Sequence, residues 1–406
     1  MGFVKKPELV LPAGSMEKLR YAFAFGADAV YAGPPDASLR ANLNDFDLGK
    51  LIKAVEYTHS IGKKTYITLN LFAHEDDLGT VENYVREMAE VSPDAFIVSD
   101  PGVVRLIENI KSKVPLHIST QANITNSESV KFWKEAGAVR VILARELHFS
   151  EIKKIRELTK NIELEIFIHG AMCMAYSGRC ILSNVLTGRD ANRGGCAQTC
   201  RWRYYLVEET RPTESFQIDQ DERGTYILNS RDLCLIDRIP LLKDLEIDAY
   251  KIEGRTKNIF YVSLAAKAYR KVIDDVFDRN ESDVKNEVSD LLDLTDNHGY
   301  THGFTFADGY SKQNVQDKDD KKQNFAGLIK DVNKDKVLIK VKNPISTGDR
   351  VTAISPDEKV SMKIMDMLEN GRNIVMASGA QKQCVTATVD VLLKGDGWKF
   401  GIITKP

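Results

Sequence analysis

Between residues 7 and 256, short apolar runs alternate with longer segments in which apolar residues recur every three or four positions. This alternation predicts buried parallel strands connected by amphipathic helices. In the first helix, Ser15 is a typical N-cap residue, and Leu19, Ala22 and Phe23 follow at helical spacing. The predicted strands cover residues 8–12, 28–31, 64–70, 95–99, 116–120, 139–144, 164–168 and 249–252. Eight such units favour an α/β fold, a closed (β/α)8 TIM-like barrel, over an open doubly wound sheet.

The hydrophobic period changes to two near the end of the chain, where short apolar strands are separated by turns such as 333–335 and 369–371. This pattern predicts a small antiparallel β-barrel or sandwich domain over residues 325–406. Residues 306–324 are polar and rich in charge, and we expect them to form a linker. The TIM-like barrel then spans residues 1–305, with an insertion at about 170–235 that delays the eighth strand.

Polar residues gather where the predicted strands end. In a TIM barrel the carboxyl ends of the strands face one mouth, and that face holds the active site. Any one of these residues is ordinary at a strand end, but together they predict a polar mouth. They are Asn70, Asp100, Gln121, Asn123, Arg145, Glu146, His169, Glu253 and Arg255.

Composition narrows the class of protein only slightly. No apolar run approaches the roughly 20 residues that a membrane helix needs, and Lys5, Lys6 and Pro7 do not fit a secretory signal. We therefore expect a cytoplasmic protein without membrane contact. The net charge of the chain is −2, yet residues 321–406 hold 15 Lys and Arg against 9 Asp and Glu, a difference of +6. A basic small domain fits contact with a polyanion, and a solvated lysine-rich β-domain is the plain alternative.

Four of the six cysteines lie close together, with the spacing C-x6-C-x15-C-x3-C from Cys173 through Cys180 and Cys196 to Cys200. Cys234 lies 34 positions further on. In a reducing compartment, clustered cysteines indicate metal binding or catalysis rather than disulfides. Thiolates in a glycine-rich segment suit an iron–sulfur cluster. Structural zinc sites usually pair their cysteines twice at short spacing, and only the last pair fits here, so zinc and buried or redox thiols are the alternatives.

The segment from Glu165 to Ser183, which includes His169-Gly170-Ala171-Met172-Cys173, resembles the signature of the collagenase-like peptidase family U32. The residues at 7–14, 26–31 and 251–255 are also similar to that family, so the resemblance covers about residues 7–305. Within the family, residues 189–194 and 200–204 most resemble the bacterial prephenate-dependent tRNA uridine hydroxylases. The C-terminal domain resembles a small β-barrel that several members carry.

The resemblance implies a tRNA-modifying enzyme, a tRNA hydroxylation activity that makes 5-hydroxyuridine at the wobble position with prephenate as co-substrate. It also implies a [4Fe–4S] cluster on four cysteines. Cys173, Cys180 and Cys196 match the family without ambiguity. For the fourth ligand we favour Cys234, because the strand-like piece before it should return to the same mouth, and Cys200 is the alternative.

The side-chain chemistry of other residues near the cysteines indicates roles in binding and proton transfer. Arginines near the cysteines suit the two carboxylates of prephenate, because a guanidinium pairs with a carboxylate in bidentate fashion. These are Arg179, Arg189, Arg193, Arg231 and Arg255. Arg201 and Arg203 alternate with Trp202 and Tyr204, a mixture of charge and stacking surface that suits RNA binding, although the aromatic pair fits a buried strand face equally well. His169 and Glu253 are candidate proton-transfer groups.

Two alternatives to an RNA hydroxylase remain at this point. A peptidase would need a nucleophile beside a base, or a zinc motif such as H-E-x-x-H, which no histidine of this chain forms. His169 could serve as a base near Cys173, but a cysteine bound to a cluster is not available as a nucleophile. A cluster-bearing subunit that acts only with a paralogous partner is the third interpretation.

Overall fold

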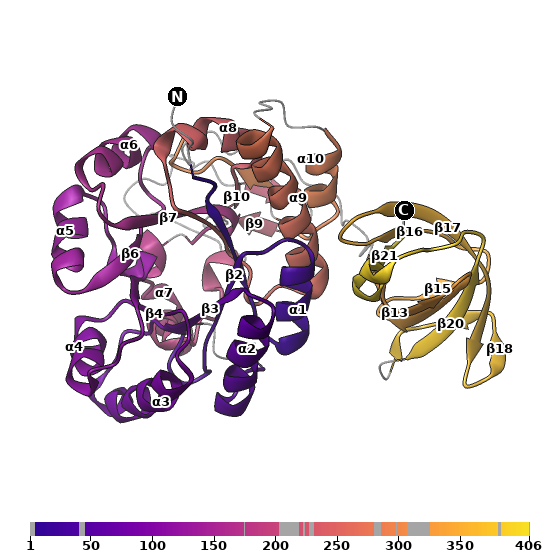
Figure 1. Ribbon diagram of the computed structural model, residues 1–406, viewed down its shortest axis with the longest axis horizontal. Helices are drawn as coiled ribbons and strands as arrows, with labels where there is room; N and C mark the ends of the chain where they lie inside the picture. The colour runs from indigo at the N-terminus through magenta and orange to yellow at the C-terminus, as the bar shows by residue number, and fades with distance from the viewer. Residues whose placement is uncertain are drawn as a thin grey trace.

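The computed structural model describes residues 5–39, 45–173, 175–202, 219–221, 224–226, 231–279, 286–297, 299–306, 325–380 and 383–405. Eight parallel strands form a closed barrel, and Figure 1 shows helices arranged around it. The ring closes because β11 pairs with both β1 and β7. The strands are β1 (Glu8–Pro12), β2 (Ala29–Ala32), β3 (Lys64–Leu69), β4 (Ala95–Val98), β5 (Leu116–Ile118), β6 (Ala138–Ile142), β7 (Glu163–Ala171) and β11 (Ala249–Ile252). The predicted TIM-like barrel is confirmed.

The helices begin where short polar residues cap them. Ser15 accepts a hydrogen bond from the backbone of Lys18, and Asp47, Asn126 and Asn258 cap later helices in the same way. Buried apolar side chains on one face of each helix pack against the strands in a continuous core. The helices are α1 (Met16–Ala24), α2 (Leu48–Ser60), α3 (Leu78–Val91), α4 (Pro101–Ile110), α5 (Ser127–Glu135), α6 (Phe149–Leu158), α7 (Leu182–Thr187), α8 (Ile239–Leu242), α9 (Ile259–Asp278) and α10 (Asn286–Asp293). No helix in the described ranges is both long and apolar enough to cross a bilayer.

Strand β7 is longer than the apolar run that predicts it, because a second partner extends it. Strand β10 (Asp232–Cys234) pairs antiparallel with its end, with Cys234 opposite His169. Strand β12 (Tyr300–Thr301) then pairs with β10. The extra pairing lies outside the barrel ring and could not be predicted from residues 169–171, which lack an apolar alternation. It brings the end of the cysteine-rich insertion back to the wall of the barrel.

The C-terminal domain is a closed six-stranded antiparallel barrel, which resolves the choice between barrel and sandwich. Its ring runs β16, β21, β13, β14, β20, β17, and β16 pairs with β17 to close it. Trp398, on a short 3-10 helix, is fully buried in the domain's own core. The strands are β13 (Phe325–Asn333), β14 (Lys336–Val341), β15 (Ile345–Ser346), β16 (Arg350–Ile354), β17 (Lys359–Glu369), β18 (Arg372–Ile374), β19 (Met376–Ala377), β20 (Cys384–Val389) and β21 (Ile402–Thr404).

The small barrel packs against α1 and α9 of the large one (Figure 1). The ring of Phe325 stacks on Phe260 of α9 with centroids 5.1 Å apart. The ammonium of Lys330 lies 2.6 Å from the carboxylate of Glu17, and Lys267 donates a 2.9 Å hydrogen bond to the carbonyl of Ser355. Apolar stacking and partly buried polar contacts together hold the small barrel against the large one. The predicted linker, 306–324, lies outside the described residues except for Phe306.

Candidate active site

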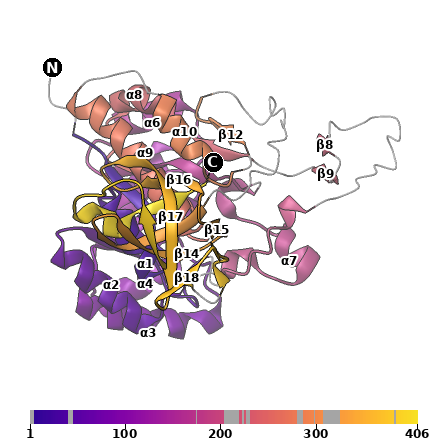
Figure 2. The same ribbon diagram turned by 90° about the vertical axis from the view of Figure 1, so that its right-hand side faces the viewer.

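A cavity lies at the carboxyl ends of the barrel strands, between these ends and the cysteine-rich segment that contains α7. In Figures 1 and 2 together, α7 covers one end of the barrel. Five of the nine predicted mouth residues line this cavity. The polar side chains that the strand ends contribute include Thr68, Asn70, Ser119, Thr120, Gln121, Arg145, Lys251, Glu253 and Arg255. The predicted polar mouth therefore exists.

The other four predicted mouth residues have structural roles or face elsewhere. Asp100 caps α4 by accepting a 2.7 Å hydrogen bond from the backbone of Gly102. Glu146 accepts a hydrogen bond from the hydroxyl of Ser177 at 2.6 Å. Asn123 adopts a left-handed backbone conformation with φ of 58° at the end of a 3-10 turn. His169, on β7, packs against the tyrosine rings of α9 instead of lining the cavity.

Four of the six cysteines border the cavity. Cys173, Cys180, Cys196 and Cys200 all line it and are half-buried. Among the described residues, no three His, Cys, Asp or Glu side chains are grouped closely enough to hold a metal ion. The chemistry of the donors nevertheless fits an iron–sulfur cluster, because the four cysteines that line the cavity can supply soft thiolate ligands.

Cys234 occupies a different environment. It is buried on β10, and its Sγ lies 3.7 Å from the hydroxyl of Tyr269 on α9. Burial raises the pKa of its thiol to about 11. Cys234 is thus separated from the cavity by the pairing of β10 with β7, whereas the sequence favours it as the fourth ligand.

The cysteine segment is held by hydrogen bonds between its own turns and to the barrel. The side-chain amide of Asn192 donates to the carbonyl of Cys180 at 3.0 Å, and its carbonyl oxygen accepts from the Cys180 backbone at 3.1 Å. The hydroxyl of Ser183 accepts from the backbone of Ala197 at 3.0 Å. The backbone N–H of Gln198 donates to the Cys196 sulfur at 3.4 Å. Such N–H groups near thiolates are typical of iron–sulfur sites.

The predicted substrate-binding arginines do not lie together at one site. Arg255 lines the cavity. Arg179 donates to the carbonyl of Gln121 at 2.8 Å and lies over the ring of Phe72. Arg193 forms an ion pair with Asp77 of the barrel.

The remaining arginines lie at or beyond the edge of the described site. Arg189 makes a long 3.5 Å contact with the carbonyl of Cys196. Arg231 lies beside Gly299, and it does not line the cavity. The side chain of Arg201 and the whole of Arg203 lie outside the described residues.

His169 is turned away from the cavity by an irregularity in strand pairing. Lys251 pairs with Phe167, but the next residue of β11, Ile252, pairs with His169, so β7 contains one extra residue. A bulge of this kind reverses the face of the following side chain. His169 consequently packs against Tyr261 and Tyr269 of α9, with ring centroids 5.7 and 5.4 Å away. Its role as a proton-transfer group stays a prediction, and its position does not favour contact with a molecule in the cavity.

Glu253, the other predicted proton-transfer residue, does line the cavity. Its backbone passes so close to β7 that only glycine fits opposite: a Cβ on Gly170 would lie 2.6 Å from the carbonyl oxygen of Glu253. Gly170 also has φ of +111°, which side chains disfavour. The glycine of the His169-Gly170 pair thus allows the close packing that positions Glu253.

Lys251 is a cavity residue that the sequence reasoning did not select. It lies within β11, only 4% exposed, and its ammonium donates a 2.7 Å hydrogen bond to Glu165. Burial lowers the pKa of Lys251, although Glu165 opposes this effect. A lysine inside an apolar strand is the signal that would have found it, since charged residues are almost never buried without a partner.

Comparison with known proteins gives the same family as the sequence motifs. The model of peptidase family U32 matches residues 14–315, and that of the family U32 C-terminal domain matches residues 321–395. The chain is 37% identical over 414 residues to tRNA hydroxylation protein P of Escherichia coli (strain K12), covering 91% of each. It is 38% identical over 358 residues to tRNA hydroxylation protein P1 of Bacillus subtilis (strain 168), covering 87% of this chain and 84% of the relative. A solved structure, the U32 peptidase Mk0906, is similar with 14% identity and a TM-score of 0.40, over 63% of this chain and 97% of that one.

Proposed function

The chain belongs to peptidase family U32, and on that premise we propose that it is an RNA-modifying enzyme that hydroxylates a tRNA wobble uridine to 5-hydroxyuridine. The observation that carries the proposal is one cavity that combines four thiols with cationic and amide side chains. Amides such as Asn70 and Gln121 suit the edge of an extruded base, which an enzyme reads by hydrogen bonds. The relatives' names, tRNA hydroxylation proteins, support the same substrate class.

The cofactor in this proposal is a [4Fe–4S] cluster on Cys173, Cys180 and Cys196. A bound cluster would supply electron transfer or polarisation of a ligand. Cys200 lines the same cavity, which supports it as the fourth ligand, and Cys234, which the sequence favours, is the alternative. Prephenate is the proposed co-substrate, and Glu253 is the proposed proton-transfer residue at the cavity wall.

The test uses the full chain purified without oxygen. We expect about four iron and four sulfide per chain, together with conversion of uridine to 5-hydroxyuridine in tRNA when prephenate is added, measured by nucleoside mass spectrometry. Cys173→Ala should lose both iron and product. Cys384→Ser is the matched control, because Cys384 is exposed on β20 of the small barrel and should not affect iron. Iron-free wild-type protein that still hydroxylates tRNA would refute the cluster, and unmodified tRNA with full iron content would refute the reaction.

The small barrel is proposed to hold RNA through its excess of basic residues. Lys334, Lys336 and Lys342 are exposed on it, and the test changes all three to Gln. If these lysines neutralise phosphates, the slope of log affinity for tRNA against log salt should fall by about 0.7 for each phosphate that is no longer neutralised. An unchanged slope would exclude these lysines from the RNA interface. The same purified chain, active alone, would exclude the need for a paralogous subunit.

Peptide hydrolysis is the alternative function that the name of the family indicates. A thiol peptidase needs a base beside its nucleophile. His169, the histidine closest in sequence to a cavity cysteine, is buried on the other face of β7 and packs on tyrosines. The described site therefore supports RNA hydroxylation better, and release of peptides from a gelatin substrate by the full chain would reverse that judgement.

A further inference from the structure

Lys251 lies at the base of the cavity and is fixed on several sides. Its ammonium is 2.7 Å from Glu165 Oε1 and lies 4.5 Å above the centroid of the Tyr31 ring. The ring of Phe167 lies 5.7 Å away on the neighbouring strand. A cation held against two ring faces and one carboxylate has little freedom to turn to solvent. Its remaining donors are therefore available only to a group inside the cavity.

Two arginines face the same space. The guanidinium of Arg145, three residues beyond β6, lies 3.9 Å from the centroid of Phe167, the ring that Lys251 also approaches. Its Nη1 donates to the carbonyl of Ala171 at 3.1 Å, while its Nε–H is buried and has no partner in the described part of the chain. A buried unsatisfied donor is costly and calls for an acceptor. Arg255 is held in place by Thr68, to whose hydroxyl it donates at 2.9 Å.

The charge inside the cavity is unbalanced. Apart from the cysteines that are proposed to hold a cluster, its charged lining residues in the described chain are three cations, Arg145, Lys251 and Arg255, against a single acid, Glu253. Buried charges are normally paired, so an excess of cations around a small cavity indicates an anionic ligand.

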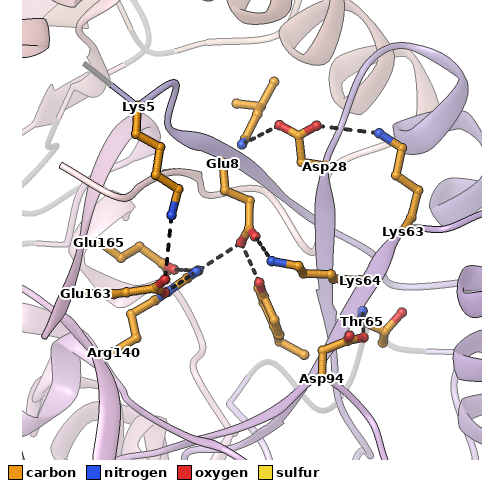
Figure 3. Close-up of polar contacts among 12 residues, drawn as sticks. Lys5, Glu8, Asp28, Lys63, Lys64, Thr65, Asp94, Arg140, Glu163 and Glu165 are labelled. Atoms are coloured by element: carbon orange, nitrogen blue, oxygen red, sulfur yellow. Dashed lines mark hydrogen bonds and ion pairs between the residues drawn. The ribbon is translucent and has the colours of Figure 1, made fainter. Parts of the chain in front are cut away.

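The carboxylate of Glu165 does not restore the balance, because it is shared. It is fully buried and accepts hydrogen bonds from Lys251 on one side and from Arg140 at 3.1 Å on the other. Figure 3 shows Arg140 turned toward Glu8, Glu163 and Glu165 at the amino ends of the strands. This chain of ion pairs runs inside the barrel below the cavity. Glu165 thus contacts the Lys251 ammonium from the side of the amino ends of the strands, and a ligand can contact it from the side of the cavity.

We infer that Lys251 and Arg145, with Arg255, form the binding site for a small dicarboxylate at the base of the cavity. The inference rests on the proposed function, in which prephenate, a dicarboxylate, is the co-substrate. Two guanidinium groups and an ammonium can receive two carboxylates. An RNA phosphate is a poorer match for this position, because Lys251 is only 4% exposed within the barrel, where a polynucleotide backbone does not reach. Phe167 and Tyr31 offer apolar contact to the body of the ligand.

The test measures binding rather than turnover, by isothermal titration calorimetry on the full chain without oxygen or RNA. Prephenate is the dicarboxylate probe, phenylpyruvate the monocarboxylate, succinate the dicarboxylate without a ring, and inorganic phosphate the oxyanion. We expect Lys251→Met and Arg145→Gln each to weaken prephenate binding at least about tenfold, because charge-assisted hydrogen bonds are strong. Phenylpyruvate should bind wild type more weakly and be weakened less by these substitutions. Lys267→Met, at the domain interface, is the matched control and should bind prephenate as wild type does.

A second variant separates charge from packing. Arg145→Lys keeps the positive charge that Arg145→Gln removes, so it should weaken prephenate binding less than Arg145→Gln does. Equal weakening in Arg145→Lys and Arg145→Gln would mean that Arg145 acts through packing and would overturn the site, as would wild-type affinity in Lys251→Met and Arg145→Gln. If phosphate and RNA compete with prephenate no better than chloride does, the site is specific for carboxylates. If phosphate binds more tightly than any carboxylate, the proposed site is wrong. If succinate binds and depends on Lys251 while prephenate does not bind, the site stands and the proposed co-substrate fails.

Discussion

The buried position of His169 makes the stability of the large barrel depend on pH in a calculable way. The side chain is 1% exposed and enclosed by the rings of Tyr261, Tyr269 and Tyr300. Burial lowers the pKa of His169 from 6.5 to about 4, because the charged imidazolium loses its hydration there. In the unfolded chain the imidazole keeps its ordinary pKa. Between these two values the unfolded chain binds a proton that the folded chain does not.

The sign and size of the effect follow from proton linkage. Above the unfolded pKa the group is neutral in both states and has no effect. As pH falls below it, protonation lowers the free energy of the unfolded state, so the folded state becomes less stable. With a folded pKa of about 4, the loss of stability amounts to about 2 kcal/mol between about pH 7 and about pH 5. It approaches about 3.4 kcal/mol below the folded pKa, since one pKa unit corresponds to about 1.4 kcal/mol.

The perturbation is His169→Gln, and the assay is urea unfolding followed by far-ultraviolet circular dichroism at both pH values. The described α-helices belong to the large barrel, so this signal reports its unfolding. Between the two pH values, the free energy of unfolding should fall by about 2 kcal/mol more in wild type than in His169→Gln. This difference holds whatever the substitution does to stability at either pH alone. Val85→Ala, a buried substitution on α3 that removes no titrating group, should lower stability and keep the wild-type pH dependence. An identical pH dependence in wild type and His169→Gln would refute the buried neutral imidazole.

Three further predictions concern packing and metal binding. Gly170→Ala should destabilise the large barrel by roughly 2 kcal/mol or more, measured in urea, because its Cβ would meet the carbonyl of Glu253 at 2.6 Å and φ is +111°. Cys200→Ser and Cys234→Ser should differ in iron content after anaerobic purification; loss only in Cys200→Ser places the fourth ligand at the cavity, and loss only in Cys234→Ser requires the end of β10 to move. Lys267→Met should lower stability by about 1–2 kcal/mol, because it removes hydrogen bonds to carbonyls of the small barrel, and an unchanged unfolding midpoint would show that these bonds add nothing.

Much of the molecule follows from local sequence. Apolar runs of four to six residues, each followed by a capped amphipathic helix, are enough to predict a barrel strand by strand, because burial of one face depends on spacing along the chain. The change to a period of two beyond residue 325 predicts the second domain for the same reason. The position of the mouth also follows, since parallel strands place their carboxyl ends at one side of a barrel. Asn70, Gln121, Glu253 and Arg255 line the cavity as that rule requires.

Tertiary structure decided what depends on pairing between distant strands. The extra residue in β7 turns His169 out of the cavity, and it is defined only by the register of β7 against β11. The pairing of β10 with β7 buries Cys234 beside Tyr269, although the strand-like piece before it predicts that it lies at the mouth with the other thiols. Lys251 is visible in the sequence as a lysine within an apolar strand, but its contacts with Glu165, Tyr31 and the cavity exist only in the fold. Sequence periodicity determines which residues are buried, whereas the partner of a buried charge is chosen by contacts between strands far apart in the chain.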